Sequence, residues 1–88
     1  MYNFPTYRKI PSGEAERRVQ FEKIYSEVAE AEIEADFIGS PVKYIMELWD
    51  IIHDTETALK EFPSPLVDAC RKVVIENNRA RGYYNDEQ

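Results

Sequence analysis

The break at Gly39-Ser40-Pro41 constrains the fold most, because it separates two long stretches, 14–38 and 42–62, that contain neither glycine nor proline. Glycine suits the position just after a helix, serine suits an N-cap, and proline suits the first helical position. The whole chain has only three glycines, and its five prolines lie at segment edges. The sequence therefore predicts an all-α fold in which two helices form an antiparallel hairpin.

Both flanks of this break carry apolar residues at helical spacing. The first helix is predicted to follow an N-cap at Ser12 and to run for about 25 residues, or about 37 Å. Its apolar seam consists of Phe21, Ile24, Val28, Ala31, Ala35 and Ile38. The second helix is predicted over 41–61. Its seam consists of Ile45, Leu48, Ile52, Thr55, Leu59 and Phe62, widened by Val42, Met46 and Trp49.

Two further segments complete the chain. Ser64-Pro65 repeats the cap-plus-proline pattern of Ser40-Pro41, and a third helix is predicted over 65–79. Residues 1–11 contain two prolines, three aromatic residues and no helical period, which is typical of an extended arm. We expect the aromatic residues of this arm to pack on a neighbouring subunit or to close over a ligand. Residues 12–84 then form a single domain, and 85–88 form a short tail.

Length and charge limit the partners of such a chain. Eighty-eight residues give a small core, so the apolar seams predict a homo-oligomer in which two copies form a four-helix-bundle-type core. A net charge of -6 argues against binding a nucleic-acid polymer, whose phosphates need a basic surface. A single cysteine and the lack of a long apolar run or signal-peptide pattern predict a cytoplasmic protein that does not bind membranes.

Two acidic pairs flank the break: Glu27-x-x-Glu30 on one side and Glu47-x-x-Asp50 on the other. Residues three apart on a helix lie about 60° apart around the axis and about 4.5 Å apart along it, so each pair projects to one side. In an antiparallel hairpin the two pairs can converge, and converging carboxylates repel one another unless a hard cation lies between them. The alternative interpretation is a solvated acidic face.

Basic residues gather near the C-terminal end, at Arg71, Lys72, Arg79 and Arg81. Lysine and arginine near the end of a helix commonly interact with the helix dipole. They would also suit a triphosphate held in front of the acidic pairs.

The order of these elements resembles the MazG-type nucleotide pyrophosphohydrolases, an all-α group that also includes dimeric dUTPases. The family pattern is Glu-Glu-x-x-Glu, a spacer, and Glu-x-x-Asp. Here it reads Ser26-Glu27-Val28-Ala29-Glu30, sixteen residues, and Glu47-Leu48-Trp49-Asp50. An Asn-x-x-Arg-Gly-Tyr ending follows from Asn78. The resemblance covers about 21–84.

The resemblance implies hydrolysis of a nucleoside triphosphate to the monophosphate and pyrophosphate, with base and sugar preference left open. It implies a site that binds Mg²⁺, or Mn²⁺ in its place, through Glu27, Glu30, Glu47 and Asp50. It also implies substrate contacts by Asn78, Arg81 and Lys72, and assembly as a homodimer or homotetramer. One position departs from the family pattern, because Ser26 replaces the leading glutamate and cannot act as a carboxylate base or ligand. The resemblance therefore predicts metal binding more directly than turnover, and Asp54 is a candidate substitute acid.

Other interpretations remain open at this point. The chain could be a non-catalytic helical binding or regulatory module that retains the MazG-like scaffold. A carboxylate-bridged di-iron protein could use Asp50-x-x-His53, but such sites need two units of this kind, and His53 is the only histidine. Trp49 could stack on a nucleotide base or pack in the core.

Overall fold

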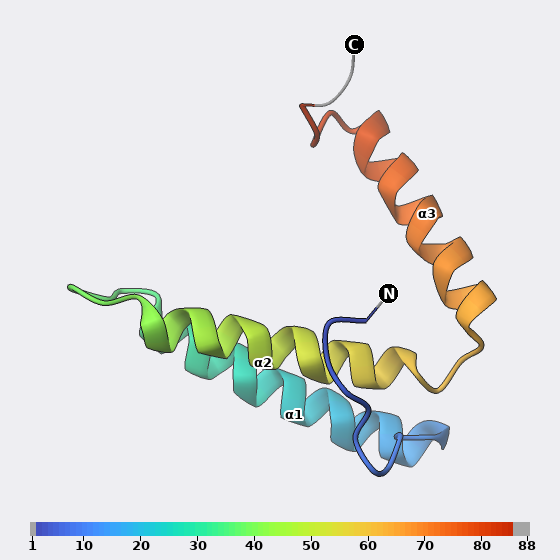
Figure 1. Cartoon of the computed structure of the whole chain (residues 1–88), viewed down its shortest axis with the longest axis horizontal. Coiled ribbons are helices and arrows are strands. Elements are labelled where there is room, and N and C mark those ends of the chain that lie inside the picture. The colour runs from blue at the N-terminus through green and yellow to red at the C-terminus, as the bar shows by residue number, and fades with distance from the viewer. Residues whose placement is uncertain (1, 86–88) are drawn as a thin grey trace.

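The computed structural model describes residues 2–85, which form three α-helices: α1 (Gly13–Glu34), α2 (Val42–Leu59) and α3 (Ser64–Ala80). Within these residues there is no strand, so the all-α prediction is confirmed. Figure 1 shows that α1 and α2 lie side by side as an antiparallel hairpin, while α3 extends away from its end. None of the helices in the described range is both long and apolar enough to cross a membrane.

The helix ends follow the predicted break with one difference. α1 ends at Glu34, four residues before the predicted end, and Ile38 projects from the connecting turn with 98% of its surface exposed. Gly39 has a φ of +92°, a left-handed conformation that glycine adopts without steric cost. α2 begins just after Pro41, and the Val42 N–H donates to the Ser40 hydroxyl at 3.3 Å. The turn is therefore longer than a minimal glycine-to-proline junction.

Three ion pairs define the register of the hairpin. Arg17 pairs with Glu61, Lys23 with Asp54, and Lys43 with Glu34, and the residue numbers of each pair add to 77 or 78. The same register places Glu30 opposite Glu47 and Glu27 opposite Asp50. We call two residues that face each other across the hairpin a layer. The four acidic residues thus form two neighbouring layers in the middle of the hairpin.

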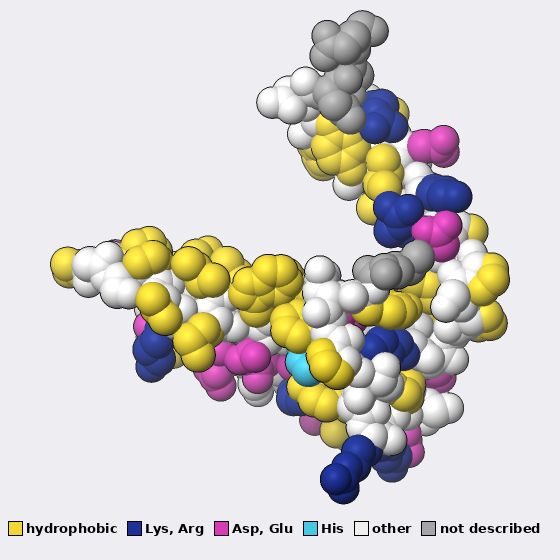
Figure 2. Space-filling model, viewed as in Figure 1, with side chains coloured by type: hydrophobic (Ala, Val, Ile, Leu, Met, Phe, Trp, Pro, Cys, Tyr) yellow, Lys and Arg dark blue, Asp and Glu magenta, His cyan; other side chains and the backbone are white. Residues whose placement is uncertain are grey.

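The apolar seam of α2 lies on an open face instead of against α1. Ile45, Leu48 and Ile52 are 47%, 39% and 38% exposed, because α2 turns its acidic stripe toward α1. Figure 2 shows hydrophobic side chains along one edge of α2 and acidic side chains over the boundary with α1. The only buried hydrophobic residues in the described part are Ala31 and Val67. A single chain therefore has almost no apolar core.

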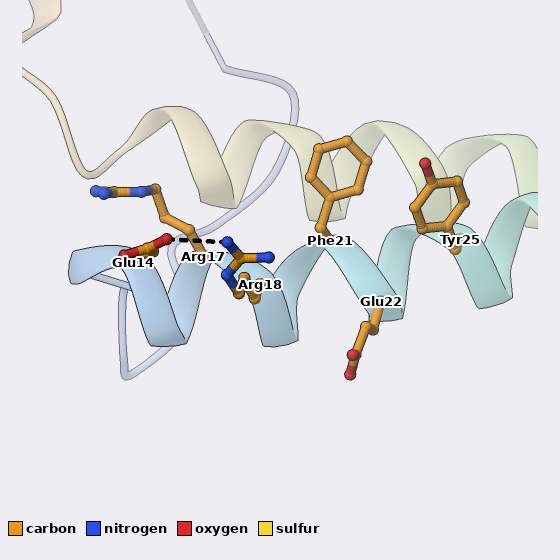
Figure 3. A pocket seen from close by; sticks show the side chains of 6 residues that line it. All are labelled: Glu14, Arg17, Arg18, Phe21, Glu22 and Tyr25. Atoms are coloured by element: carbon orange, nitrogen blue, oxygen red, sulfur yellow. Dashed lines mark hydrogen bonds and ion pairs between the residues drawn. The ribbon is translucent and has the colours of Figure 1, made fainter.

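α1 also carries aromatic residues on its exposed surface. Phe21 and Tyr25 stack with ring centroids 5.1 Å apart, although they are 58% and 67% exposed. Figure 3 shows both rings projecting from the same side of α1. Phe21 also borders an apolar cavity shared with Leu59 of α2 and with Phe62, which follows α2, so exposed apolar residues from both sides of the hairpin meet at this end.

The N-terminal arm packs on α2 of its own chain. Glu56 is 8% exposed, and its carboxylate accepts hydrogen bonds from the backbone N–H groups of Asn3 and Phe4 and from the Asn3 side chain, at 2.7 to 3.2 Å. His53 is stacked between Phe4 and Tyr7, with centroid distances of 4.4 and 4.3 Å. These contacts give an intramolecular role to aromatic residues that the sequence assigned to a subunit or ligand. Met1 and 86–88 lie outside the described residues.

Candidate metal centre

The hairpin brings three of the four predicted metal ligands together. Glu27 and Glu30 of α1 and Glu47 of α2 each offer a carboxylate oxygen, and these three oxygens lie within 4.8 Å of one another. Asp50, the fourth carboxylate, is exposed and lies opposite Glu27 in the register, and its charge acts on both Glu27 and Glu47. We call Glu27, Glu30, Glu47 and Asp50 the acidic cluster.

Glu27 has surroundings that are unfavourable for an ionised carboxylate. Burial raises the pKa of its carboxyl group, and the negative charges of Asp50, Glu30 and Asp54 raise it further. Lys23 opposes this shift only in part. The Glu27 Oε2 atom is buried and has no hydrogen-bond donor within 2–85. An ionised oxygen in this position needs a cation or a proton.

Glu47, on the opposite helix, is subject to the negative charges of the same cluster. Its partial burial raises the pKa of its carboxyl group first, followed by the charge and hydrogen-bonding contact of Glu30 and by the charges of Glu27 and Asp50. Both raised pKa values share two causes: burial disfavours the ionised form, and neighbouring carboxylates disfavour it further. A divalent cation bound here would reverse that effect.

The repulsion between carboxylates is confined to the middle of the hairpin, because the layers on both sides pair an acid with a base. Toward the turn, Glu34 forms an ion pair with Lys43 at 3.5 Å, and toward the other end, Asp54 forms an ion pair with Lys23 at 3.1 Å. Further along, Glu61 accepts from Arg17 at 2.7 Å. Each of these layers pairs an acid with a base across the hairpin. The two layers of the acidic cluster, between those of Lys43 and Lys23, pair an acid with an acid.

The donor atoms of the acidic cluster fit a hard divalent cation. Oxygen ligands of one Mg²⁺ ion lie about 2.1 Å from the metal and therefore about 3 to 4 Å apart. Oxygens within 4.8 Å can reach that separation by small side-chain rotations. Glu30 and Asp50 are exposed, so the cluster is open to solvent and to a ligand from one side.

The predicted substrate contacts lie apart from this cluster in the single chain. Lys72, Asn78 and Arg81 belong to α3 or its C-terminal end, and α3 points away from the hairpin (Figure 1). Within α3, Lys72 pairs with Asp68 at 3.3 Å, and the Arg81 guanidinium donates to the Asn78 side chain at 3.5 Å. One chain therefore does not bring these residues to the acidic cluster.

The sequence left the roles of three residues undecided, and the structure shows the surroundings of each. Ser26 is exposed on α1. Trp49 is 46% exposed and packs edge-on against Phe4, with ring centroids 5.6 Å apart. His53 accepts or donates a hydrogen bond at 3.3 Å with the Tyr7 hydroxyl through Nδ1, so its ring belongs to the contact with the arm.

Sequence reasoning did not assign a role to Lys23 or Glu56. Lys23 lies four residues before Glu27 on α1, a spacing that places both side chains on one face of the helix. That spacing was the available signal. Glu56 had no local signal, because its hydrogen-bond donors come from residues more than fifty positions earlier.

Comparisons with protein families, with curated proteins and with solved structures found no match to this chain.

Proposed function

We propose that this chain is a Mg²⁺-dependent nucleoside triphosphate pyrophosphohydrolase of the MazG type, in which Glu27, Glu30, Glu47 and Asp50 hold the metal. The observation that carries this proposal is the pair of acid-facing-acid layers in a hairpin whose flanking layers pair acids with bases. The order and spacing of the four carboxylates match the family pattern, which supports the choice of reaction.

Each part of the proposed site has a chemical task. Held by these carboxylates, Mg²⁺ would supply charge neutralisation for the phosphates and a lowered pKa for the attacking water. Glu27 and Glu47 orient the cation from opposite helices, and the open side of the cluster admits the triphosphate. Because Ser26 offers no carboxylate, proton acceptance from the water falls to an acid already in or beside the cluster.

The same proposal includes a homodimer with a four-helix core. A compact domain of this length has a radius of gyration of about 12 Å, whereas this chain has 15.6 Å. Its accessible surface of 7006 Å² exceeds the value expected for a folded monomer of 10.3 kDa by about 1,600 Å². An excess of about 1,600 Å² for each partner is within the range of obligate homodimers. The apolar face of the hairpin supplies the surface that a second copy would cover.

A second copy also accounts for the position of α3. Lys72, Asn78 and Arg81 are remote from the acidic cluster of their own chain, but α3 projects beyond the hairpin in a way that suits contact with another subunit (Figure 1). In this proposal these three residues bind the phosphates held by the cluster of the partner. A homotetramer would form from two such dimers.

The catalytic proposal is tested with purified protein, Mg²⁺ and a panel of ribonucleoside and deoxyribonucleoside triphosphates. Products are separated by ion exchange or followed by phosphorus NMR. A matched pair of variants isolates the site: Glu30→Gln lies in the cluster, and Glu32→Gln lies on the same helix outside it, and both side chains are exposed. We expect monophosphate and pyrophosphate from the wild type and Glu32→Gln, and loss of both products in Glu30→Gln.

Other results would redirect the proposal. Equal turnover in both variants would contradict the assignment of the acidic cluster. Binding of Mg²⁺ and nucleotide without turnover would favour a non-catalytic binding module and point to Ser26 as the cause. Binding of neither ligand would leave a helical interaction module with a solvated acidic face.

The dimer is tested by sedimentation of Ile52→Asp beside Glu32→Gln. Ile52 is central to the apolar face of α2, so a carboxylate there opposes its burial between subunits. We expect a dimer for wild type and Glu32→Gln and a monomer for Ile52→Asp. A well-folded wild-type monomer at all concentrations would contradict this part of the proposal.

A further inference from the structure

The layer next to the acidic cluster contains an ion pair between Lys23 and Asp54. The Asp54 side chain is 3% exposed, whereas the Lys23 side chain is 48% exposed. Asp54 Oδ1 accepts from Lys23 Nζ at 3.1 Å, but Asp54 Oδ2 is buried and has no hydrogen-bond partner among residues 2–85. A buried carboxylate normally has partners for both oxygens, so this one is only half satisfied.

The unpartnered oxygen of Asp54 has a counterpart in the acidic cluster. Glu27 Oε2 is also buried and lacks a donor in the described part of the chain, and Glu27 lies one turn after Lys23 on α1. Asp54 lies one turn after Asp50 on α2, and its charge acts on the Glu27 carboxyl group. Two buried carboxylate oxygens without donors therefore lie on adjacent layers, with one ammonium group beside them.

Lys23 is placed to leave this layer without disturbing the fold. Its ammonium group lies 4.9 Å from the centroid of the Tyr7 ring, at the solvent-exposed edge of the hairpin. A lysine side chain has a flexible four-carbon stem and a point charge that remains favourable in water. The backbone of this layer is held separately, because the Gln20 side chain donates to the Asp54 carbonyl oxygen at 2.8 Å.

We propose that Asp54 is a fifth carboxylate of the cation site and that Lys23 is its removable counter-ion, which a divalent cation displaces. Without the cation, Lys23 neutralises Asp54 and so limits the negative charge next to Glu27. When the cation binds, the Lys23 ammonium group is repelled and moves to solvent, and Asp54 turns its free oxygen toward the cation or toward water held by it. This inference rests on the metal site of the proposed function.

The test uses Mn²⁺ as the probe and measures its affinity for the full-length protein by paramagnetic resonance. Asp54→Asn keeps the shape of the side chain and removes its charge, and we expect Mn²⁺ affinity to fall about 10-fold or more, as for residues that support metal ligands. Lys23→Met removes the competing cation, and we expect affinity to rise at least about threefold. Lys23→Arg retains the charge and should behave like the wild type.

A second measurement follows the lysine itself. The side-chain nitrogen and Cε signals of Lys23 are monitored by NMR during titration with Mg²⁺. Release from Asp54 predicts a saturable shift of these signals toward those of a solvated lysine, at the same Mg²⁺ concentration that saturates the cluster. In Asp54→Asn the Lys23 signals should already resemble a solvated lysine before Mg²⁺ is added.

The outcomes separate this inference from the proposed function. Unchanged Mn²⁺ affinity in folded Asp54→Asn, or weaker affinity in Lys23→Met, overturns the role of the pair. If Asp54→Asn does not fold, Lys23→Met and the Lys23 signals decide, because both leave Asp54 in place. Loss of Mn²⁺ binding in Glu30→Gln alone upholds the acidic cluster and rejects only the pair. A wild type that binds no Mn²⁺ overturns both proposals.

Discussion

In the middle of the hairpin carboxylates face carboxylates, whereas toward both ends carboxylates face lysine or arginine. The end layers hold Glu34 with Lys43 and Glu61 with Arg17, and these pairs neutralise themselves. In the middle layers Glu27 and Glu47 have raised pKa values instead. The end layers show that this register can place a base opposite an acid. The absence of a base in the middle layers therefore supports the proposed cation site.

Glu56 differs from Glu27 and Glu47, because it is a buried carboxylate whose oxygens already have hydrogen-bond donors. Burial acts to raise the pKa of Glu56, but hydrogen bonds from Asn3 and Phe4 and the charge of Lys60 outweigh it, and the pKa is lowered. Its carboxylate thus fixes the arm to α2. Burial alone does not distinguish a structural acid from a candidate ligand, whereas the presence of donors does.

The largest expected effect comes from converting a middle layer into an end layer. Glu47→Lys places a base opposite Glu30, so the layer neutralises itself and a metal ligand is lost. We expect Mn²⁺ affinity to fall by more than the roughly 100-fold limit for residues that only support ligands, and the melting temperature of the metal-free protein to rise. Calorimetric titration and thermal melting measure the two effects. Glu32→Lys makes the same change of charge outside the cluster, and an equal loss in that variant would show a general charge effect.

A smaller effect is expected from breaking an end layer. Arg17→Met removes the partner of Glu61, whose side chain is 12% exposed, and should lower the free energy of unfolding by about 1–2 kcal/mol. The Gly13 N–H still donates to Glu61 at 3.1 Å, which limits the loss. Arg18→Met is the control, because its pair with Glu14 is exposed and should contribute less than about 0.5 kcal/mol. Chemical denaturation distinguishes the two, and equal losses would contradict the difference between them.

The pH dependence of stability gives the smallest expected effect and separates the two kinds of carboxylate. Glu27 and Glu47 have folded pKa values above their ordinary 4.5, so the metal-free protein loses stability as pH rises from 4.5 through those values. Glu56 has a folded pKa below 4.5, so its contribution is complete above 4.5 and is lost as pH falls through the folded value. Melting profiles should therefore have a maximum near pH 4.5.

Mg²⁺ and Glu47→Gln provide the controls for this profile. Saturating Mg²⁺ should remove the decline above 4.5, because the cation stabilises the ionised cluster. Glu47→Gln should reduce the same decline and leave the acid side unchanged. A decline that neither change affects would assign it to groups outside the cluster.

The helices and the acidic pairs could be predicted from sequence because both are local patterns. Glycine and proline positions define the breaks around Gly39 and Pro63, and a spacing of three brings Glu27 beside Glu30 and Glu47 beside Asp50. The early end of α1 could not be predicted in this way, since apolar spacing continues through Ile38 after the backbone has left the helix. Helix ends depend on backbone contacts that a periodic pattern does not contain.

Packing between elements was the part that sequence could not supply. An apolar stripe such as Ile45, Leu48 and Ile52 predicts burial but does not say whether the cover comes from the same chain or another. The role of Glu56 depends on donors from the arm, and the direction of α3 depends on a connection that no local pattern fixes. The separation of Arg81 from the acidic cluster is a consequence of that direction.

The most direct test of the central claim is paramagnetic broadening of backbone amide signals by substoichiometric Mn²⁺. A cation site in the middle layers predicts broadening centred on 27–30 and 47–50, with little effect at the acidic residues Glu14 and Glu76, and its loss in Glu47→Gln. Weak broadening spread over all acidic surfaces, unchanged in Glu47→Gln, would contradict the account and identify the cluster as a solvated face.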